Sequence, residues 1–300
     1  MAPISCHNVR PSDVFVGEER NTRLSKPLSP SWKDVIMKVA VAGATGRVGQ
    51  HVVDVLQERG HNVVAISRSH GVDIVSGKGL EEALRGVTCI IDTASSHSPD
   101  QASATDFFRT ASENLLAAGQ RAGVRRIVAV SIIGIDKFSA GYMAAKVVHE
   151  KAIRSGPIPV RVLRAAQFHE FVGQIIAWGT QGHVSYVPKM RTQLVAARNV
   201  AEVLVDLATA DGAFGTRAET SFVEIAGPQP EDLVDAATRL VSRYRQTLSI
   251  EGVRNAADPD VALYESGALL PGPDAILAGP TFDEWLTAVP VTHADAVAMP

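Results

Sequence analysis

The sequence predicts an α/β fold, a doubly wound parallel sheet with a small C-terminal region that caps a substrate site. Three observations predict it. A strand, a glycine-rich turn and a helix follow one another directly after Met37. Apolar strands then alternate with helices as far as residue 163, which indicates parallel strands joined by crossover helices. Beyond Arg164 this alternation loosens, as expected for a region that lies outside the sheet.

The glycine turn is the most informative segment, because it holds Gly43, Gly46 and Gly49. The apolar run 39–42 predicts a buried strand before it, and apolar residues at helical spacing predict a helix at 48–58 after it. Glycines there let backbone N–H groups and the helix N-terminus meet a pyrophosphate. Since both flanking elements are present, we expect a dinucleotide-binding turn rather than an ordinary strand-to-helix turn.

The remaining elements follow from hydrophobic periodicity and from Gly, Pro and capping residues. In the sheet region we expect strands at 62–67, 72–75, 88–92, 126–133 and 160–163, with helices at 79–85, 105–122 and 142–155. Further on we expect an aromatic-bearing segment at 167–178, a strand at 184–187, a helix from Asn199 as its cap to Leu207, a strand at 222–225, and helices at 232–243 and 282–288.

Three parts are expected along the chain. Residues 1–36 contain scattered prolines and charges without periodicity, which predicts a flexible N-terminal extension. Residues 37–226 form the dinucleotide-binding domain, of which 166–190 contribute to the substrate cap. Residues 227–300 form a small C-terminal region.

Composition excludes several classes of protein. A chain of 300 residues that is 46% hydrophobic can bury a large core. Its net charge of −3 and the lack of a basic run argue against nucleic acid as a partner, and no apolar stretch reaches the roughly 20 residues that a membrane span needs. Cys6 and Cys89 provide neither a disulfide framework nor a metal cluster, so we expect a cytoplasmic protein without a metal.

The end of the second strand indicates which dinucleotide binds. An acidic residue there suits a free ribose 2′-hydroxyl and an Arg suits a 2′-phosphate. This chain has Arg68 between two serines, with Arg47 in the glycine turn as a second cation, so NADP(H) is favoured over NAD(H). Arg68 as a solvated surface cation is the alternative. Asp73 either faces the adenine amino group or lies in an exposed turn.

Ser131, Tyr142 and Lys146 are the candidate catalytic residues. Ser131 stands near the end of the strand at 126–133, and Tyr142 and Lys146, four apart, share one face of the next helix. An adjacent ammonium lowers the phenol pKa from about 10. Tyr142 would then donate a proton to a substrate oxygen that Ser131 holds, while the cofactor delivers hydride. Tyr and Lys also occur at this spacing by chance.

The substrate is expected to meet the segment after the strand at 160–163, where open sheets place ligands. Gln167, Phe168 and His169 offer an aromatic wall with polar groups. His169 either assists proton transfer or packs as a hydrogen-bonded ring. Glu150 is expected to pair with Lys146 or a neighbour.

With these residues in hand, the chain resembles the short-chain dehydrogenase/reductase superfamily, and within it an atypical branch similar to NmrA-like and NAD(P)H-binding reductase proteins. The resemblance covers about 38–289 and rests on GATGRVG, VSIIGID, GYMAAKVVHEKAIRSG and VLRAAQFHEFV. It implies a Rossmann-type domain that binds NAD(P)H, with Lys146 on the nicotinamide ribose. The expected cofactor contacts are Gly43, Thr45, Gly46, Arg47, Val48, Gly49, Arg68, Asp73, Thr93, Ala94 and Lys146.

One departure from the superfamily leaves alternatives open. Better-known members carry an Asn in the helix that here spans 105–122, and the only Asn of that stretch is Asn114, well along the helix. Our leading hypothesis is an NAD(P)H-dependent oxidoreductase that reduces a small, moderately apolar carbonyl or quinone, with this small-molecule substrate as its partner. The alternative is a non-catalytic NAD(P)H-binding redox sensor with a regulatory protein partner. A sugar-nucleotide epimerase or dehydratase ranks last, because 167–178 has no Lys or Arg for a diphosphate.

Overall fold

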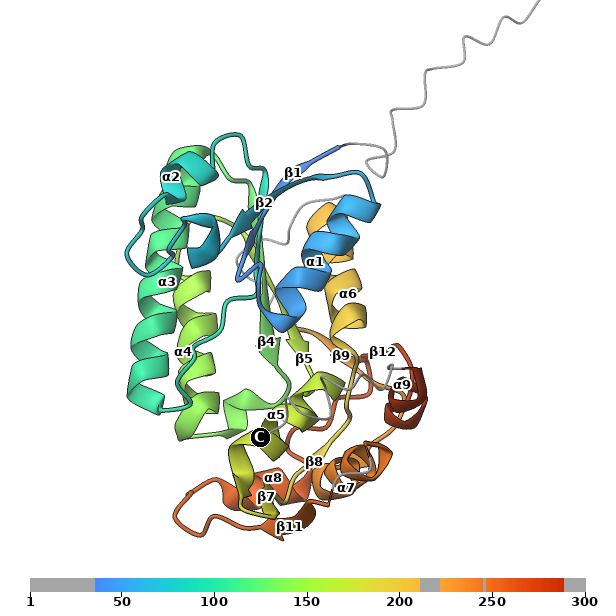
Figure 1. The fold of residues 1–300 in the computed structure, drawn as a ribbon. Helices are drawn as coiled ribbons and strands as arrows, with labels where there is room; N and C mark the ends of the chain where they lie inside the picture. The colour runs from blue at the N-terminus through green and yellow to red at the C-terminus, as the bar shows by residue number, and fades with distance from the viewer. Residues whose placement is uncertain (1–35, 211–221, 245–246, 289–300) are drawn as a thin grey trace, which may run out of the picture. The chain divides into compact units, whose positions relative to one another are not determined.

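The computed structural model describes residues 36–210, 222–244 and 247–288. Its centre is a seven-stranded sheet of parallel strands in the order β12-β9-β5-β4-β3-β1-β2 (Figure 1). The strands are β1 (Lys38–Ala42), β2 (Asn62–Ile66), β3 (Cys89–Asp92), β4 (Arg126–Ile132), β5 (Val160–Ala165), β9 (Val223–Ala226) and β12 (Ile276–Leu277). Strand order reverses between β1 and β3, which is where sheets of this type bind ligands. The predicted doubly wound fold is confirmed.

Helices cover both faces of this sheet. Figure 1 shows α1 (Arg47–Glu58) and α6 (Ala197–Thr209) on one face, and α2 (Leu80–Ala83), α3 (Gln101–Ala122) and α4 (Gly141–Arg154) on the other. Alternate strand residues feed two separate cores: Val128 belongs to the core under α1 and α6, whereas Ile127 and Ala129 belong to the core under α3 and α4. This alternation places Ser131 on the α4 side of the sheet.

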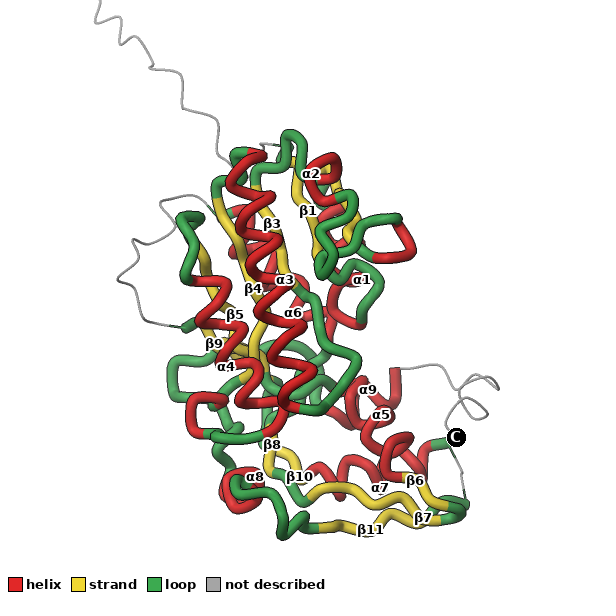
Figure 2. Tube along the Cα trace, turned by 90° about the vertical axis from the view of Figure 1, so that its left-hand side faces the viewer, coloured by secondary structure: helices red, strands yellow, loops and turns green. Residues whose placement is uncertain are grey.

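The cap and C-terminal elements form a third core. They are α5 (His169–Gly179), β6 (Thr180–Gln181), β7 (Val184–Pro188), β8 (Arg191–Thr192), β10 (Glu231–Asp232), α7 (Leu233–Arg243), β11 (Ser249–Val253), α8 (Val261–Ser266) and α9 (Phe282–Ala288). Figure 2 shows them gathered beyond the ends of β4 and β5, the edge at which the candidate site lies. The core includes Val172, Val187, Leu233 and Phe282.

The strand expected at 72–75 is absent from the structure. The Asp73 carboxylate accepts hydrogen bonds from the Val75 backbone N–H (2.9 Å) and the Ser76 hydroxyl (2.8 Å). The Asn114 amide holds the carbonyls of Ile74 and Val75 from α3. These side chains satisfy the backbone in a turn, so the short apolar run does not join the sheet.

Helix starts also differ from expectation. Helix α3 begins at Gln101 because Asp100 caps it, accepting from Ser103 N at 2.8 Å. Helix α6 begins at Ala197, so Asn199 lies inside it rather than capping it. The Glu170 carboxylate from α5 accepts from Ala197 N instead, at 3.2 Å. A partner distant in sequence thus replaces the local cap.

The elements α8, β11 and β12 were not expected from the sequence, since each is short and lacks clear periodicity. The expected flexible extension 1–36 and the end of the C-terminal region lie almost wholly outside the described residues. Within the described ranges, no helix combines the length and the apolar character that crossing a membrane requires.

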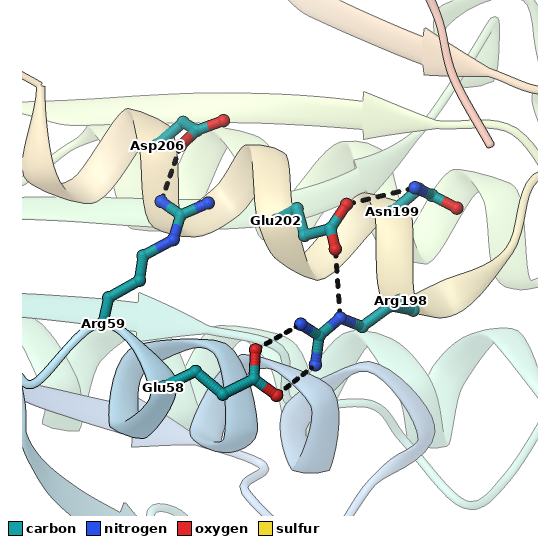
Figure 3. A network of polar contacts seen from close by, with 6 residues as sticks. All are labelled: Glu58, Arg59, Arg198, Asn199, Glu202 and Asp206. Atoms are coloured by element: carbon teal, nitrogen blue, oxygen red, sulfur yellow. Dashed lines mark hydrogen bonds and ion pairs between the residues drawn. The ribbon is translucent and has the colours of Figure 1, made fainter.

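An exposed ion-pair network ties α1 to α6 (Figure 3). The Arg198 guanidinium contacts both carboxylate oxygens of Glu58 and, at 3.1 Å, Glu202. Arg59 Nη1 contacts the Asp206 carboxylate at 2.6 Å. Because water competes for these groups, such pairs contribute little to stability. Their role is to link two helices far apart in the sequence.

Candidate functional site

The glycine turn forms a cradle of backbone at the end of β1. Gly43 has φ +76°, and a Cβ there would stand 2.9 Å from the backbone of Ala94. A Cβ at Gly49 would lie 2.0 Å from the carbonyl oxygen of Gly43. Thr93 Oγ1 donates to the carbonyl of Ala42 at 2.8 Å, which fixes the end of β3 beside the turn. The structure therefore brings together the turn and the Thr93 segment, as expected.

The N-terminus of α1 opens from this cradle. Gly46 is its cap and carries no side chain that could satisfy the first N–H groups. Thr45, Gly46 and Arg47 are exposed, whereas Val48 is buried in the core, so Val48 can offer a ligand only its backbone. Backbone N–H groups at a helix start that no side chain caps fit an anionic pyrophosphate.

Arg47 turns toward the cap. Its Nη1 donates to the backbone carbonyl of Glu170 in α5. Burial lowers the pKa of the Arg47 guanidinium, and the Glu170 charge opposes this shift. Arg47 therefore links the cofactor turn to the first turn of α5.

Arg68 stands directly after β2, where the ribose of a dinucleotide is expected. It is exposed, and its Nη2 lies 2.8 Å from Nε2 of His97. Asp73 directs both carboxylate oxygens into its own turn, and the backbone N–H of Val75 is the main group that lowers its pKa. Contact of Asp73 with adenine stays a prediction.

Tyr142 has a partner that the sequence did not indicate. Its Oη lies 2.8 Å from Oγ of Ser95, in the segment after β3. Burial raises the pKa of Tyr142, and the hydrogen bond from Ser95 partly opposes this. Ser131 is 3% exposed on β4, and its Oγ has no hydrogen-bond partner among the described residues. The position of Ser95, just after a central strand, is the signal that could have revealed it.

Lys146 points into a buried network. Its Nζ donates to the Val130 carbonyl at 2.9 Å, lies 2.7 Å from Nδ1 of His149, and sits 4.6 Å from the centre of the Phe108 ring. Burial lowers the pKa of Lys146 to about 8, opposed by the charges of Asp92 and Glu150. The expected effect, an ammonium that lowers the phenol pKa of Tyr142, is not what the structure shows: the Tyr142 pKa is raised.

Asp92 and His149 complete this network, and neither was expected as a site residue. His149 Nε2 lies 3.0 Å from Oδ2 of Asp92, and Oδ1 of Asp92 accepts from Ala94 N at 3.0 Å. The Phe108 ring stacks on the imidazole with centroids 4.7 Å apart. A carboxylate ending an apolar strand, and a His three residues after Lys146 on the same helix face, are the signals that could have shown them.

Glu150 pairs with Arg164 of β5 instead of Lys146. Two hydrogen bonds, of 3.0 and 2.9 Å, join the guanidinium to the two carboxylate oxygens. Arg164 also contacts Asp136 and stands 3.5 Å from the centre of the Phe222 ring. A buried bidentate pair of this kind fixes α4 to the sheet.

The expected substrate residues lie at the start of α5. Gln167 Oε1 accepts from the Thr192 hydroxyl, while its Nε2 is buried without a partner in the described part of the chain. Phe168 precedes α5 and forms an isolated parallel β-bridge with Val195. His169 is buried between Phe282 and Trp285, and burial lowers its pKa to about 4. In the structure His169 thus packs as a neutral ring, which is the second of the two alternatives expected from the sequence.

Comparison with known proteins agrees with a dinucleotide site at the glycine turn. A family model described as NAD(P)H-binding matches residues 43–211. The chain belongs to this NAD(P)H-binding family. The match begins at the first glycine of the turn, directly after β1, and ends after α6, so it includes β2 to β5, Tyr142 and Lys146. The match confirms the expected NAD(P)H-binding character of the chain, and the finer assignment to an NmrA-like reductase branch stays a prediction.

One curated relative of this family member is the photosystem II assembly factor Ycf39 of Synechocystis sp., 27% identical over 194 residues. The match covers 57% of this chain and 59% of the relative, less than two thirds of its length. Among solved structures, Bordetella bronchiseptica WbmH with NAD+ has a TM-score of 0.61 at 16% identity, covering 84% and 97% of the two chains. Thermus thermophilus UDP-glucose 4-epimerase with NAD scores 0.56 at 17% identity, covering 84% and 92%. At these identities the structures establish the fold alone.

Proposed function

We propose that the protein is an NADPH-dependent reductase of a small, moderately apolar carbonyl or quinone. The observation that carries this proposal is the hydrogen-bonded pair of Tyr142, which is half-buried, and Ser95, which is exposed; their hydroxyl oxygens are 2.8 Å apart, beside Thr93 and Ala94 at the glycine cradle. A phenol held by a hydroxyl next to a dinucleotide site is placed to donate a proton to a substrate oxygen.

Different residues would bind the cofactor and the substrate. The turn from Gly43 to Gly49 holds the pyrophosphate through backbone N–H groups. Lys146 has three N–H donors, of which Val130 and His149 take two, so one remains for a ribose hydroxyl. When bound, the dinucleotide supplies the hydride. Ser131 Oγ and Gln167 Nε2, both without a partner among the described residues, are free to bind substrate polar groups.

The choice of NADPH rests on Arg68. Among the described residues no carboxylate is hydrogen-bonded to Arg68, which follows β2, whereas the Arg47 guanidinium donates to the Glu170 carbonyl in the cap. The Arg68 guanidinium suits a 2′-phosphate, which a neutral ribose would not require. Arg68→Ala should weaken NADPH binding and leave NADH binding nearly unchanged. Equal losses for both would rule out the phosphate contact.

The test of the reaction is NADPH oxidation with a panel of aldehydes, ketones and quinones. Tyr142→Phe should lower kcat by about 100-fold or more, the usual worth of a general acid, and leave NADPH affinity unchanged. Tyr186→Phe is the matched control, because Tyr186 is an exposed tyrosine of β7 in the cap. Equal turnover of Tyr142→Phe and wild type would exclude the phenol as proton donor.

The second candidate is a non-catalytic NAD(P)H-binding regulator with a protein partner. Two observations favour it: the pKa of Tyr142 is raised, which opposes phenolate formation, and the curated relative is named as an assembly factor. Tight NADPH binding with no turnover of any panel substrate would support this candidate. A pull-down in the presence and absence of NADPH would then test for a partner.

A further inference from the structure

Asp92, His149 and Lys146 form a continuous chain of hydrogen bonds that ends at the candidate site. The exposed fractions of the three residues are 2%, 2% and 4%. The two links measure 3.0 Å, from Asp92 Oδ2 to His149 Nε2, and 2.7 Å, from His149 Nδ1 to Lys146 Nζ. Burying a carboxylate, an imidazole and an amine costs free energy unless each group is hydrogen-bonded to its neighbour, so a role beyond stability is expected for these three residues.

The partners decide which nitrogen of His149 carries the proton. A carboxylate only accepts, so Nε2 must donate to Asp92, and an ammonium only donates, so Nδ1 must accept from Lys146. Ala94 N occupies the other oxygen of Asp92, which leaves the carboxylate no freedom to turn. Burial and the charge of Lys146 lower the pKa of His149, which agrees with a neutral ring.

We propose that Asp92 and His149 are positioning residues for Lys146: Asp92 selects the Nε2–H tautomer of His149, whose Nδ1 then holds Lys146 as an ammonium aimed at the cofactor ribose. This arrangement would take the place of the Asn support that better-known members of the superfamily carry. Its effect on turnover rests on the proposed reductase function. The tautomer of His149 and the charge of Lys146 do not depend on that function.

The other groups around Lys146 are few. Glu150 is the second carboxylate whose charge acts on it, from one turn further along α4, and Glu150 is itself bonded to Arg164 of β5. Tyr142 is one turn before Lys146, and Phe108 of α3 contributes only its ring. Asp92 and Glu150 therefore both favour the charged amine, but only Asp92 is bonded to His149.

This difference supplies a matched pair of variants, Asp92→Asn and Glu150→Gln, each of which removes one carboxylate charge near Lys146. In Asp92→Asn the amide oxygen must accept from Ala94 N, so the amide NH₂ faces Nε2 of His149. Nε2 must then accept, which moves the proton to Nδ1 and points it at Lys146. The Lys146 ammonium then loses Nδ1 of His149 as its acceptor and faces an N–H donor instead. Glu150→Gln keeps the tautomer.

The experiment measures two quantities. Long-range ¹H–¹⁵N NMR of the ligand-free protein reports the tautomer of His149, and fluorescence titration with NADPH from pH 6 to pH 10 reports the pH at which affinity falls. We expect Nε2–H in wild type and Glu150→Gln, and Nδ1–H in Asp92→Asn. We expect the fall in affinity to move to lower pH by at least about one unit in Asp92→Asn, a tenfold change in proton affinity, and by less in Glu150→Gln.

The outcomes separate this inference from the reductase proposal. An Nδ1–H or doubly protonated His149 in wild type overturns the inference, and this measurement needs no variant to fold. Equal pH shifts in the two variants also overturn it, since charge alone would then explain both. The expected tautomers and shifts without turnover of any carbonyl or quinone would support the inference and refute the reductase.

Discussion

The exposed network between α1 and α6 and the buried network around Lys146 use the same kinds of residue for different ends. Arg198, 36% exposed along its side chain, contacts its carboxylates at the solvent-exposed surface, and the hydrogen bonds that it donates to them raise its pKa further above the ordinary value (Figure 3). Lys146 meets its partners out of water, and burial lowers its pKa to about 8. Arg198 is bonded directly to carboxylates, whereas Lys146 is bonded to a carbonyl and an imidazole, so at Lys146 the loss of solvation outweighs the carboxylate charges.

The buried network therefore contributes little net stability, but it suits a functional role. A group titrating near pH 8 can change its charge in the physiological range, whereas Arg198 stays charged throughout. Buried ion pairs also repay their desolvation only when every partner is present. Removing a partner that leaves a carboxylate buried and unpaired should therefore cost much stability inside the sheet, whereas removing an exposed partner between α1 and α6 should cost little.

The largest expected effect on stability comes from Arg164→Met. This change leaves the Glu150 carboxylate buried without its bidentate partner, which typically costs about 3 to 5 kcal/mol of unfolding free energy. Urea denaturation at pH 7 measures it. The control is Arg164→Met combined with Glu150→Met, which should recover most of the loss. Failure to recover would mean that Arg164 acts through Asp136 or Phe222 instead.

Next in size is Lys146→Met, which separates function from stability. NADPH affinity should fall by about tenfold or more, because the variant lacks the donor proposed for the ribose hydroxyl. The thermal midpoint at pH 7 should stay level or rise, since a methionine avoids the cost of burying an ammonium. Calorimetry and fluorescence titration check the two parts. A clear fall in the midpoint would show that the buried network stabilises the fold after all.

A third prediction uses pH. Burial holds the folded pKa of His169 near 4, while the unfolded chain takes up a proton near 6.5, so the unfolded state binds more protons between these values. Stability from this group is complete above pH 6.5 and is lost as pH falls toward 4, by about 2 kcal/mol between pH 7 and pH 5. The urea midpoint of wild type should therefore fall more steeply with decreasing pH than that of His169→Phe. Parallel curves would contradict the buried neutral ring.

The smallest effect is expected at the surface. Arg198→Met should lower the thermal midpoint by no more than about 2 °C at low salt. At 1 M NaCl the difference should vanish, because the screening length falls to about 3 Å. Scanning calorimetry at the two salt concentrations measures it. A large loss that salt does not reduce would mean that Arg198 works through packing of its stem.

Much of the fold could be predicted because its signals are local. Apolar runs and glycines identified β1, the cradle and α1, and Asp232 was correctly expected at the start of a helix, where it caps α7. The errors occurred where a distant residue satisfied the backbone. Asn114 of α3 holds the turn at 74–75, and Glu170 of α5 caps α6 in place of Asn199. No local pattern contains such partners.

For the candidate site, the sequence by itself determined which residues share a helix face and which follow a strand, since backbone periodicity fixes both. It thereby placed Gly43, Tyr142 and Lys146 in one region of the fold. Only the tertiary structure decided their partners: Ser95 for Tyr142, and His149 with Asp92 for Lys146. Asp92 and Ser95 come from the end of β3 and the segment after it, which the fold brings beside α4, and burial there sets pKa values that no spacing reveals.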